Sequence, residues 1–207
     1  MKVEIKEDIG FKDKVLFRKG LNVDFQDKVN LVVGLNGSGK TTFLRCIRQF
    51  EDKVNWNIES KELRQSTSLD KEYKVFSHFA REDDSSGMAV VDMDLFLSLD
   101  GLNRMKKSSG ESNLIAICNL IEKARKYDGG KPVLILLDEV AHSFDYKMQH
   151  HMSQILKQMG EVGTVIYVTH NIFLMNAQSH LYLIENKEVK RTKTVIAKAK
   201  MLTSKHN

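Results

Sequence analysis

The apolar positions of this chain fall into two patterns, short continuous runs and longer stretches that are apolar on one face only. Continuous runs of strand length, rich in β-branched residues, occupy residues 28–33, 133–137 and 164–169, and they indicate buried strands. Helical periodicity marks residues 112–127 and 144–159. Because buried strands alternate with helices, the pattern predicts an α/β fold with a parallel or mixed sheet flanked by helices.

Glycines follow both predicted helices. Asp128-Gly-Gly130 comes directly after the first, and Gly160 comes directly after the second. Glycine tolerates a positive φ and commonly stands just beyond the last helical residue. We therefore expect the helices to end at these positions.

The first 25 residues predict short strands that form an antiparallel β-subdomain, with turns at residues 8–10 and 19–20. Residues 51–69 are polar and have weak patterns. Residues 73–79 alternate like a strand, and residues 81–87 have the composition of an exposed loop.

The composition is that of one folded domain. The chain has 207 residues, of which 42% are hydrophobic, enough for a real core. No apolar run approaches the ~20 residues of a membrane span, and the first residues lack the apolar stretch of a signal peptide. Two cysteines suggest no disulfide framework. These features predict a cytoplasmic protein with reduced thiols and without a membrane partner.

The net charge of +5 is concentrated at the C-terminal end. From Lys187 onward, seven Lys or Arg residues accompany one acid, Glu188. Two interpretations of this basic end, residues 187–207, stay open. It can contact nucleic acid, either DNA or RNA, or an acidic protein partner, or it can be a solvated tail without a partner.

Residues 34–41 read Gly-Leu-Asn-Gly-Ser-Gly-Lys-Thr, the phosphate-binding loop pattern, and they lie between a predicted strand and a predicted helix. Glycines let successive backbone N–H groups converge on phosphate oxygens, and the helix N-terminus adds positive potential. Lys40 can neutralise the β- and γ-phosphates, and the Thr41 hydroxyl can ligate Mg²⁺. The predicted nucleotide-binding set here is Gly34, Leu35, Asn36, Gly37, Ser38, Gly39, Lys40, Thr41 and Thr42.

Two acids follow the apolar run at residues 133–137, namely Asp138 and Glu139. At the carboxyl end of a strand, Asp138 is placed to hold Mg²⁺ through its water shell. Glu139 is placed to activate a water molecule for attack on the γ-phosphate. The sequence thus predicts binding and hydrolysis of a nucleoside triphosphate, with Lys40 and Glu139 as catalytic residues.

Three further segments narrow the class. Lys107-Ser-Ser-Gly-Glu111 lies directly before a predicted helix, Ser143-Phe-Asp145 follows the two acids, and His170 follows a buried strand. Together with the phosphate loop, and in this order, they resemble the ABC ATPase superfamily. The resemblance spans nearly the whole chain. It implies a single ABC-type ATPase domain over residues 1–207, with a small helical lobe at about residues 50–127 that carries the signature motif.

The resemblance also implies a composite site. In ABC ATPases two heads meet head-to-tail, and each ATP lies between the phosphate loop of one subunit and the signature of the other. Carried to this chain, Ser108 and Gly110 would contact the γ-phosphate in trans at a helix N-terminus, and His170 would act on it in cis as a catalytic residue. The other residues that the resemblance adds to the ATP site are Ser109, Glu111, Ser143 and Asp145. ATP and Mg²⁺ would hold a homodimer that hydrolysis releases.

Within the superfamily the signature spelling is similar to that of the non-transporter branch, the SMC-, RecF- and OLD-like AAA ATPases. Only 70 residues separate Lys40 from Gly110, so the head is expected to be compact and without a coiled coil. The glutamine that the family places after the strand before the signature lobe is not visible; His78 and Arg81 stand in that region. Phe11 and Phe17 are candidates for stacking on adenine, although both suit a core position better.

These motifs support three hypotheses about function. The first is an ATP-hydrolysing switch that acts with nucleic acid or with a nuclease-like or other effector protein. The second is the nucleotide-binding subunit of an ABC transporter. The third is a binding module in which ATP holds a dimer and turnover is negligible.

Overall fold

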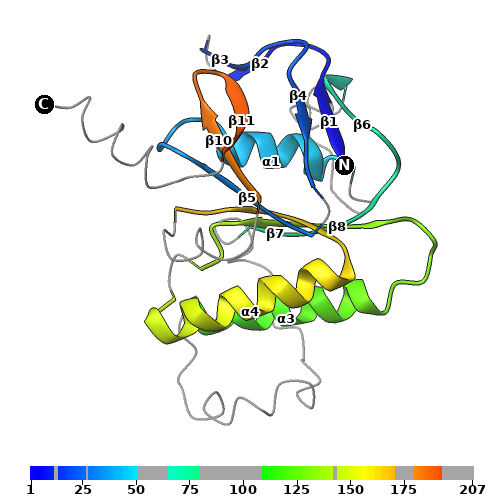
Figure 1. Ribbon diagram of the computed structural model, residues 1–207, viewed down its shortest axis with the longest axis vertical. Helices are drawn as coiled ribbons and strands as arrows, with labels where there is room; N and C mark the ends of the chain where they lie inside the picture. Colours follow the sequence, from blue (N-terminus) through cyan, green and yellow to red (C-terminus); the bar gives the residue numbers. More distant parts are fainter. Residues whose placement is uncertain are drawn as a thin grey trace, which may run out of the picture.

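The computed structural model describes residues 1–11, 14–26, 28–50, 65–79, 109–141, 144–170 and 180–192 (Figure 1). A six-stranded sheet in the order β11-β10-β5-β9-β8-β7 forms its centre. The strands are β5 (Val29–Gly34), β7 (Lys74–Phe79), β8 (Val133–Asp138), β9 (Thr164–Val168), β10 (His180–Glu185) and β11 (Glu188–Thr192). All neighbours pair in parallel except β10 and β11, which form an antiparallel hairpin. The prediction of a mixed, largely parallel sheet is confirmed.

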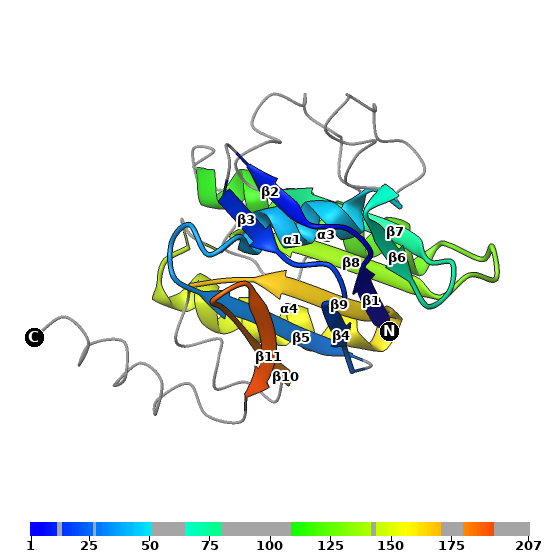
Figure 2. The same cartoon turned by 90° about the horizontal axis from the view of Figure 1, so that it is seen from above.

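Helices cover both faces of this sheet. Helix α1 (Lys40–Arg48) lies on one face, and α3 (Ser109–Arg125) and α4 (Tyr146–Val162) lie side by side on the other (Figures 1 and 2). Successive side chains along a strand point to opposite faces of the sheet, so each strand contributes to the core on both faces. On β8, Leu134 and Leu136 join the core beneath α1, whereas Ile135 and Leu137 join the core against α3 and α4. Burial on both faces explains why the strand is a continuous apolar run.

The first 25 residues supply four strands of two small antiparallel sheets, which confirms the predicted β-subdomain, and residues 67–69, from the polar stretch, add a fifth strand that was not predicted. One has the order β4-β1-β6, with β1 (Lys2–Ile5), β4 (Asn22–Asp24) and β6 (Thr67–Leu69), and the other is the hairpin of β2 (Ile9–Phe11) and β3 (Lys14–Phe17). Helix α1 lies between these sheets and the central sheet (Figure 1). The predicted turn at residues 19–20 is present, with Gly20 at a φ of 86°. The turn predicted at residues 8–10 is wrong in part, because Ile9 and Gly10 already belong to β2.

Helix α4 differs from its prediction at both ends. It begins at Tyr146, because the Asp145 carboxylate caps it by accepting a hydrogen bond from Met148 N at 2.8 Å. It continues through Gly160 to Val162. A Cβ at Gly160 would meet Val29 Cγ2 at 3.1 Å, so this glycine permits close packing of the helix on β5 and does not end the helix.

Several predicted features lie outside the described residues. Much of the predicted small lobe, residues 51–64 and 80–108, belongs to this part of the chain, as do the predicted loop at residues 81–87 and residues 193–207 of the basic end. Within the described ranges, no helix combines the length and the apolar character that crossing a membrane requires.

Candidate functional site

The phosphate-binding loop connects the carboxyl end of β5 to the first residue of α1. Gly39 caps the helix in a left-handed conformation, with a φ of 97°, and Gly37 is also left-handed, with a φ of 73°. Residues with a Cβ rarely adopt this conformation, so both glycines shape the turn. The first turn of α1 holds no acidic residue, and no side chain caps it. The helix N-terminus therefore presents backbone N–H groups and positive potential to an anion.

Gly34, the first residue of the loop, packs closely against β10 and Ser38. A Cβ at this position would lie 2.6 Å from the carbonyl oxygen of Ile184 on β10 and 2.7 Å from Ser38 Oγ. No side chain fits there without moving the neighbouring strand. The first glycine of the motif therefore allows the loop to fold tightly onto the edge of the sheet.

Lys40 is the first residue of α1 and lies almost entirely inside the loop, with 5% of its surface exposed. Its Nζ donates hydrogen bonds to the carbonyl oxygens of Gly34 at 3.1 Å and Leu35 at 2.9 Å. The ammonium group thus lies where the loop would enclose an anion. Ser38 Oγ is buried and has no hydrogen-bond partner within the described residues, which fits a loop built to receive further acceptors.

The two acids lie at the same edge of the sheet as the loop. Asp138 ends β8, pairs in register with Val168 of β9 and Phe79 of β7, and is 8% exposed. Since β9 separates β8 from β5, the carboxyl ends of these three parallel strands are adjacent. Ligands of open α/β sheets bind at this edge. Asp138 and the phosphate loop therefore border one site.

Glu139 and His170 are in direct contact at this edge. Glu139 Oε1 lies 2.9 Å from His170 Nε2, and the two side chains are 14% and 40% exposed. Glu139 has a φ of 50°, which is uncommon for a residue with a Cβ. Its N–H donates to the Val168 carbonyl at 3.0 Å. The structure thus joins the predicted base and the predicted γ-phosphate contact, which lie 31 positions apart in the sequence.

The residues present suit Mg²⁺ bound together with a triphosphate. Among the described residues, no group of three or more His, Cys, Asp or Glu side chains could form a metal site by itself. Mg²⁺ commonly takes one or two protein ligands and completes its shell with water and substrate phosphates. Asp138 and the Thr41 hydroxyl match that donor set. The ion would neutralise charge on the phosphates.

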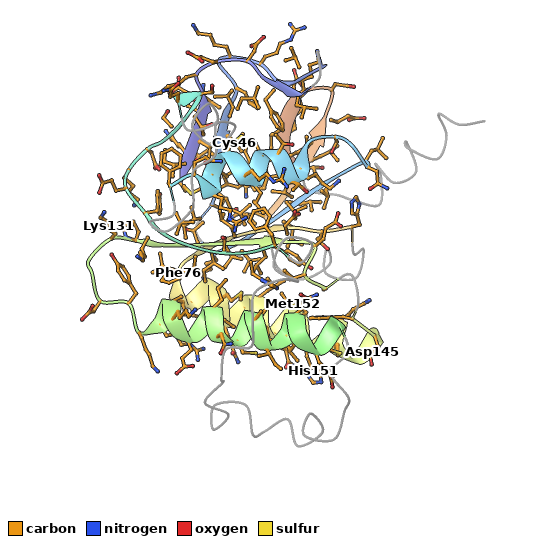
Figure 3. All side chains as sticks on the ribbon, turned by 180° about the vertical axis from the view of Figure 1, so that it is seen from behind. Cys46, Phe76, Lys131, Asp145, His151 and Met152 are labelled. Carbon is orange, nitrogen blue, oxygen red and sulfur yellow. The ribbon has the colours of Figure 1, made fainter. Side chains whose placement is uncertain are left out.

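The signature segment is described only in part. Ser109 begins α3, Gly110 is buried, and Glu111 is buried in the first turn of that helix. The placement at a helix N-terminus agrees with the prediction. Ser108 and Ser143 lie outside the described residues. Asp145 lies at the start of α4 (Figure 3), where its carboxylate caps the helix.

Two residues named in the sequence analysis, Phe17 and His78, make contacts inside the fold. Phe17 is fully buried and packs edge-on against Phe43 of α1, with ring centroids 5.4 Å apart, so it belongs to the core and does not stack on adenine. His78 is buried on β7, and its Nε2 lies 3.2 Å from Asn113 Oδ1 on α3. His78 therefore connects β7 to α3. Neither contact was predictable from a motif.

Comparison with known proteins identifies the fold. The family model described as AAA domain matches residues 11–50. The glutamine transport ATP-binding protein of Escherichia coli is 27% identical over 206 aligned residues, covering 83% of this chain and 82% of the relative. A probable amino-acid ABC transporter ATP-binding protein of Haemophilus influenzae is 27% identical and covers 74% and 72% of the two chains.

Two solved structures have the same architecture. A dimeric ATP-binding cassette in a post-hydrolysis state, bound to ADP and phosphate, matches with a TM-score of 0.57 at 17% identity, over 93% of this chain and 97% of the other. The SMC head domain of Thermotoga maritima matches with a TM-score of 0.60 at 17% identity, over 93% and 98%. The chain has the P-loop NTPase fold in the form found in ABC-type ATPases. The matches include both transporter and SMC proteins, so the predicted non-transporter branch is not confirmed.

Proposed function

We propose that this chain is an ATP-hydrolysing switch that dimerises head-to-tail around two Mg-ATP. The contact between Glu139 and His170 beside the phosphate loop carries the proposal, because it places a carboxylate base and an imidazole at the edge where a γ-phosphate would lie. The solved dimeric cassette, whose fold this chain shares, supports an assembly of two heads.

Each residue has a distinct task in this proposal. The loop N–H groups and Lys40 bind the phosphates, while Asp138 and Thr41 hold Mg²⁺. Glu139 accepts a proton from the attacking water. His170, which contacts Glu139, orients that carboxylate and contacts the γ-phosphate.

The signature completes the site from the second subunit. Within one chain, α3 and its first turn lie on one face of the central sheet, whereas the phosphate loop leads into α1 on the opposite face (Figure 1). A single subunit therefore presents two half-sites, and a second copy supplies Ser108, Ser109 and Gly110. Binding energy from the γ-phosphate would then stabilise the dimer.

For the partner of the switch, we propose a membrane transporter in preference to nucleic acid. The relatives from Escherichia coli and Haemophilus influenzae are named as ATP-binding proteins of transport systems and align along most of their length. The nucleic-acid alternative rests on the basic end. In the described part of that end, Lys190 contacts Glu188, and the Arg191 guanidinium lies 2.8 Å from His180 Nδ1. Local neighbours therefore already engage two of the three cations there, the third being Lys187.

Light scattering on the Glu139→Gln variant, with and without ATP and Mg²⁺, tests the assembly. The variant should retain ATP and change from monomer to dimer. Ser108→Arg in the same background should remain monomeric, because a bulky cation replaces the small γ-phosphate contact. As a control, Gln158→Arg adds the same charge at an exposed position near the C-terminal end of α4. This variant should dimerise as before. A monomer at saturating ATP contradicts the composite site, as does a dimer that Ser108→Arg does not affect.

A further inference from the structure

Tyr167 lies in the middle layer of the molecule, with its hydroxyl directed to the loop that follows β8. It belongs to β9, pairs in register with Leu137, and is fully buried in the core against α3 and α4. A buried phenol needs hydrogen-bond partners. Those of Tyr167 are the N–H of Ala141, at 3.3 Å from the hydroxyl, and the side chain of Thr169.

These partners belong to the two segments that carry the proposed chemistry. Ala141 is two residues after Glu139, and Thr169 immediately precedes His170. Burial raises the pKa of Tyr167 to about 12, opposed by the hydrogen bonds to Thr169 and Ala141 and reinforced by the carboxylates of Glu139 and Asp138. The phenol is therefore neutral at any working pH and can serve both partners as a fixed hydrogen-bonding group.

The loop after β8 is tied at three points to β9 and to His170, just beyond the end of that strand. The N–H of Glu139 bonds to the Val168 carbonyl at 3.0 Å, the Glu139 carboxylate contacts His170, and the N–H of Ala141 bonds to the Tyr167 hydroxyl. The Ala141 carbonyl in turn accepts a hydrogen bond from Phe144 N at 3.2 Å. Of these three contacts, the one with Tyr167 is made by a fully buried side chain.

The backbone of Glu139 shows why such a tie matters. Its φ of 50° lies in a region that costs free energy for a residue with a Cβ, and it persists only where the surroundings hold it. If the Tyr167 hydroxyl were absent, the buried N–H of Ala141 would lose its acceptor and the loop would shift to regain one. The carboxylate would then leave the position in which it contacts His170.

We propose that Tyr167 is a positioning residue for hydrolysis, which holds the loop of Glu139 and the strand end of His170 as one unit. The inference rests on the proposed function, because it assigns no chemistry to Tyr167 itself. It predicts that the hydroxyl contributes to turnover and not to ATP binding, since the phosphate loop makes no described contact with it.

Tyr167→Phe tests this with little change in packing, because only the hydroxyl oxygen is removed. We expect kcat to fall on the order of tenfold, because misplacing a catalytic group has costs of this order or larger, while the Kd for ATP changes less than about twofold. Tyr182→Phe is the matched control. Tyr182 is also buried, and its hydroxyl bonds to the Asp24 carbonyl and the Gln26 N–H, at 2.7 and 3.3 Å. For Tyr182→Phe we expect a fall in Tm similar to that of Tyr167→Phe, but a kcat equal to that of the wild type.

A double variant separates positioning from general loosening. In the Glu139→Gln background, Tyr167→Phe should cause no further loss of the residual rate, because both changes act through the same carboxylate. If Tyr167→Phe does not fold, Thr169→Val removes the other partner of the hydroxyl, and a lower kcat at unchanged ATP affinity supports the proposal.

Wild-type kcat in Tyr167→Phe, or in Thr169→Val if that variant is needed, overturns the inference. Equal losses of kcat in Tyr167→Phe and Tyr182→Phe overturn it too, because they would indicate only lost stability. These outcomes differ from failure of the proposed function itself, in which the wild type does not hydrolyse ATP or Glu139→Gln hydrolyses it undiminished.

Discussion

The two ends of the central sheet differ in how their polar groups are paired. At the amino end, Asn30 is fully buried on β5 and bonds to the backbone of Gln26, Lys28 and Val165. The Tyr182 hydroxyl meets the same Gln26 N–H. Every one of these groups serves the local backbone, which is the usual state of buried polar atoms.

At the carboxyl end, the backbone conformations are less common and the polar side chains are less completely paired. Gly37, Gly39 and Glu139 have a positive φ. Ser38 Oγ has no partner among the described residues, and His170 is partly exposed beside Glu139. Leu35, the second residue of the loop, is 54% exposed and is the one exposed large hydrophobic residue in the described ranges. Strain and incomplete pairing of this kind concentrate at functional sites.

Under the proposed function, the contrast separates a structural polar cluster at the amino end from a functional one at the carboxyl end. Substitutions at the amino end should lower stability and leave turnover intact, whereas substitutions at the carboxyl end should affect ATP and leave the fold intact. Buried side chains alone do not reveal this difference, because Asn30 and Lys40 are both almost inaccessible.

The largest effect expected on ATP binding is that of Lys40→Ala. Removing the ammonium group should weaken ATP affinity on the order of 10- to 100-fold, because a charge-assisted contact to phosphate is lost. Isothermal titration calorimetry measures it. Lys74→Ala, the same change at the first residue of β7 and thus at the amino end of the sheet, should bind ATP normally. Equal affinities of the two variants would remove the distinction between the ends.

Asn30→Ala should have the opposite profile. Loss of its amide removes the hydrogen bonds to the partly buried Gln26 carbonyl and the buried Val165 carbonyl, at a cost of about 1–3 kcal/mol. For a domain of this size Tm should fall on the order of 5 °C. Calorimetry and phosphate release are measured on the same preparation. A fall in kcat at a temperature well below the new Tm would show that the amino end also serves catalysis.

The smallest effect concerns the basic end. If it binds nucleic acid, affinity should fall about tenfold or more between roughly 50 and 200 mM salt, since its cations would displace counterions from phosphates. Fluorescence anisotropy with duplex and single-stranded DNA and RNA compares the full chain with one that ends at Lys193. Equal or absent binding in both would exclude this role and favour the transporter partner.

Local motifs explain how much of the site could be predicted. Gly34 to Thr41 are contiguous in sequence, as are the two acids at the end of β8, and each group needs only its own strand and turn to be placed. The strands β5, β8 and β9 were equally predictable, because burial on both faces makes each a continuous apolar run. The parallel sheet could be inferred from their alternation with helices.

The features that the sequence does not predict depend on contacts between distant segments. Tyr167 and Ala141 meet because β8 and β9 are neighbours in a particular register, which no local pattern encodes. The predicted helix end at Gly160 is wrong, because close packing on Val29 explains this glycine. Strand β6 has only three residues and lies in a polar stretch, where pairing with β1 defines it as a strand.

Glu139→Gln tests the central claim most directly, through ATP affinity and steady-state phosphate release measured on one preparation. The amide keeps the shape of the side chain but cannot accept the proton of the attacking water. ATP binding should be retained, and turnover should fall by at least ~10²-fold. Undiminished hydrolysis by Glu139→Gln would contradict the assignment of Glu139 as the base and, with it, the account of the carboxyl end as the catalytic end of the sheet.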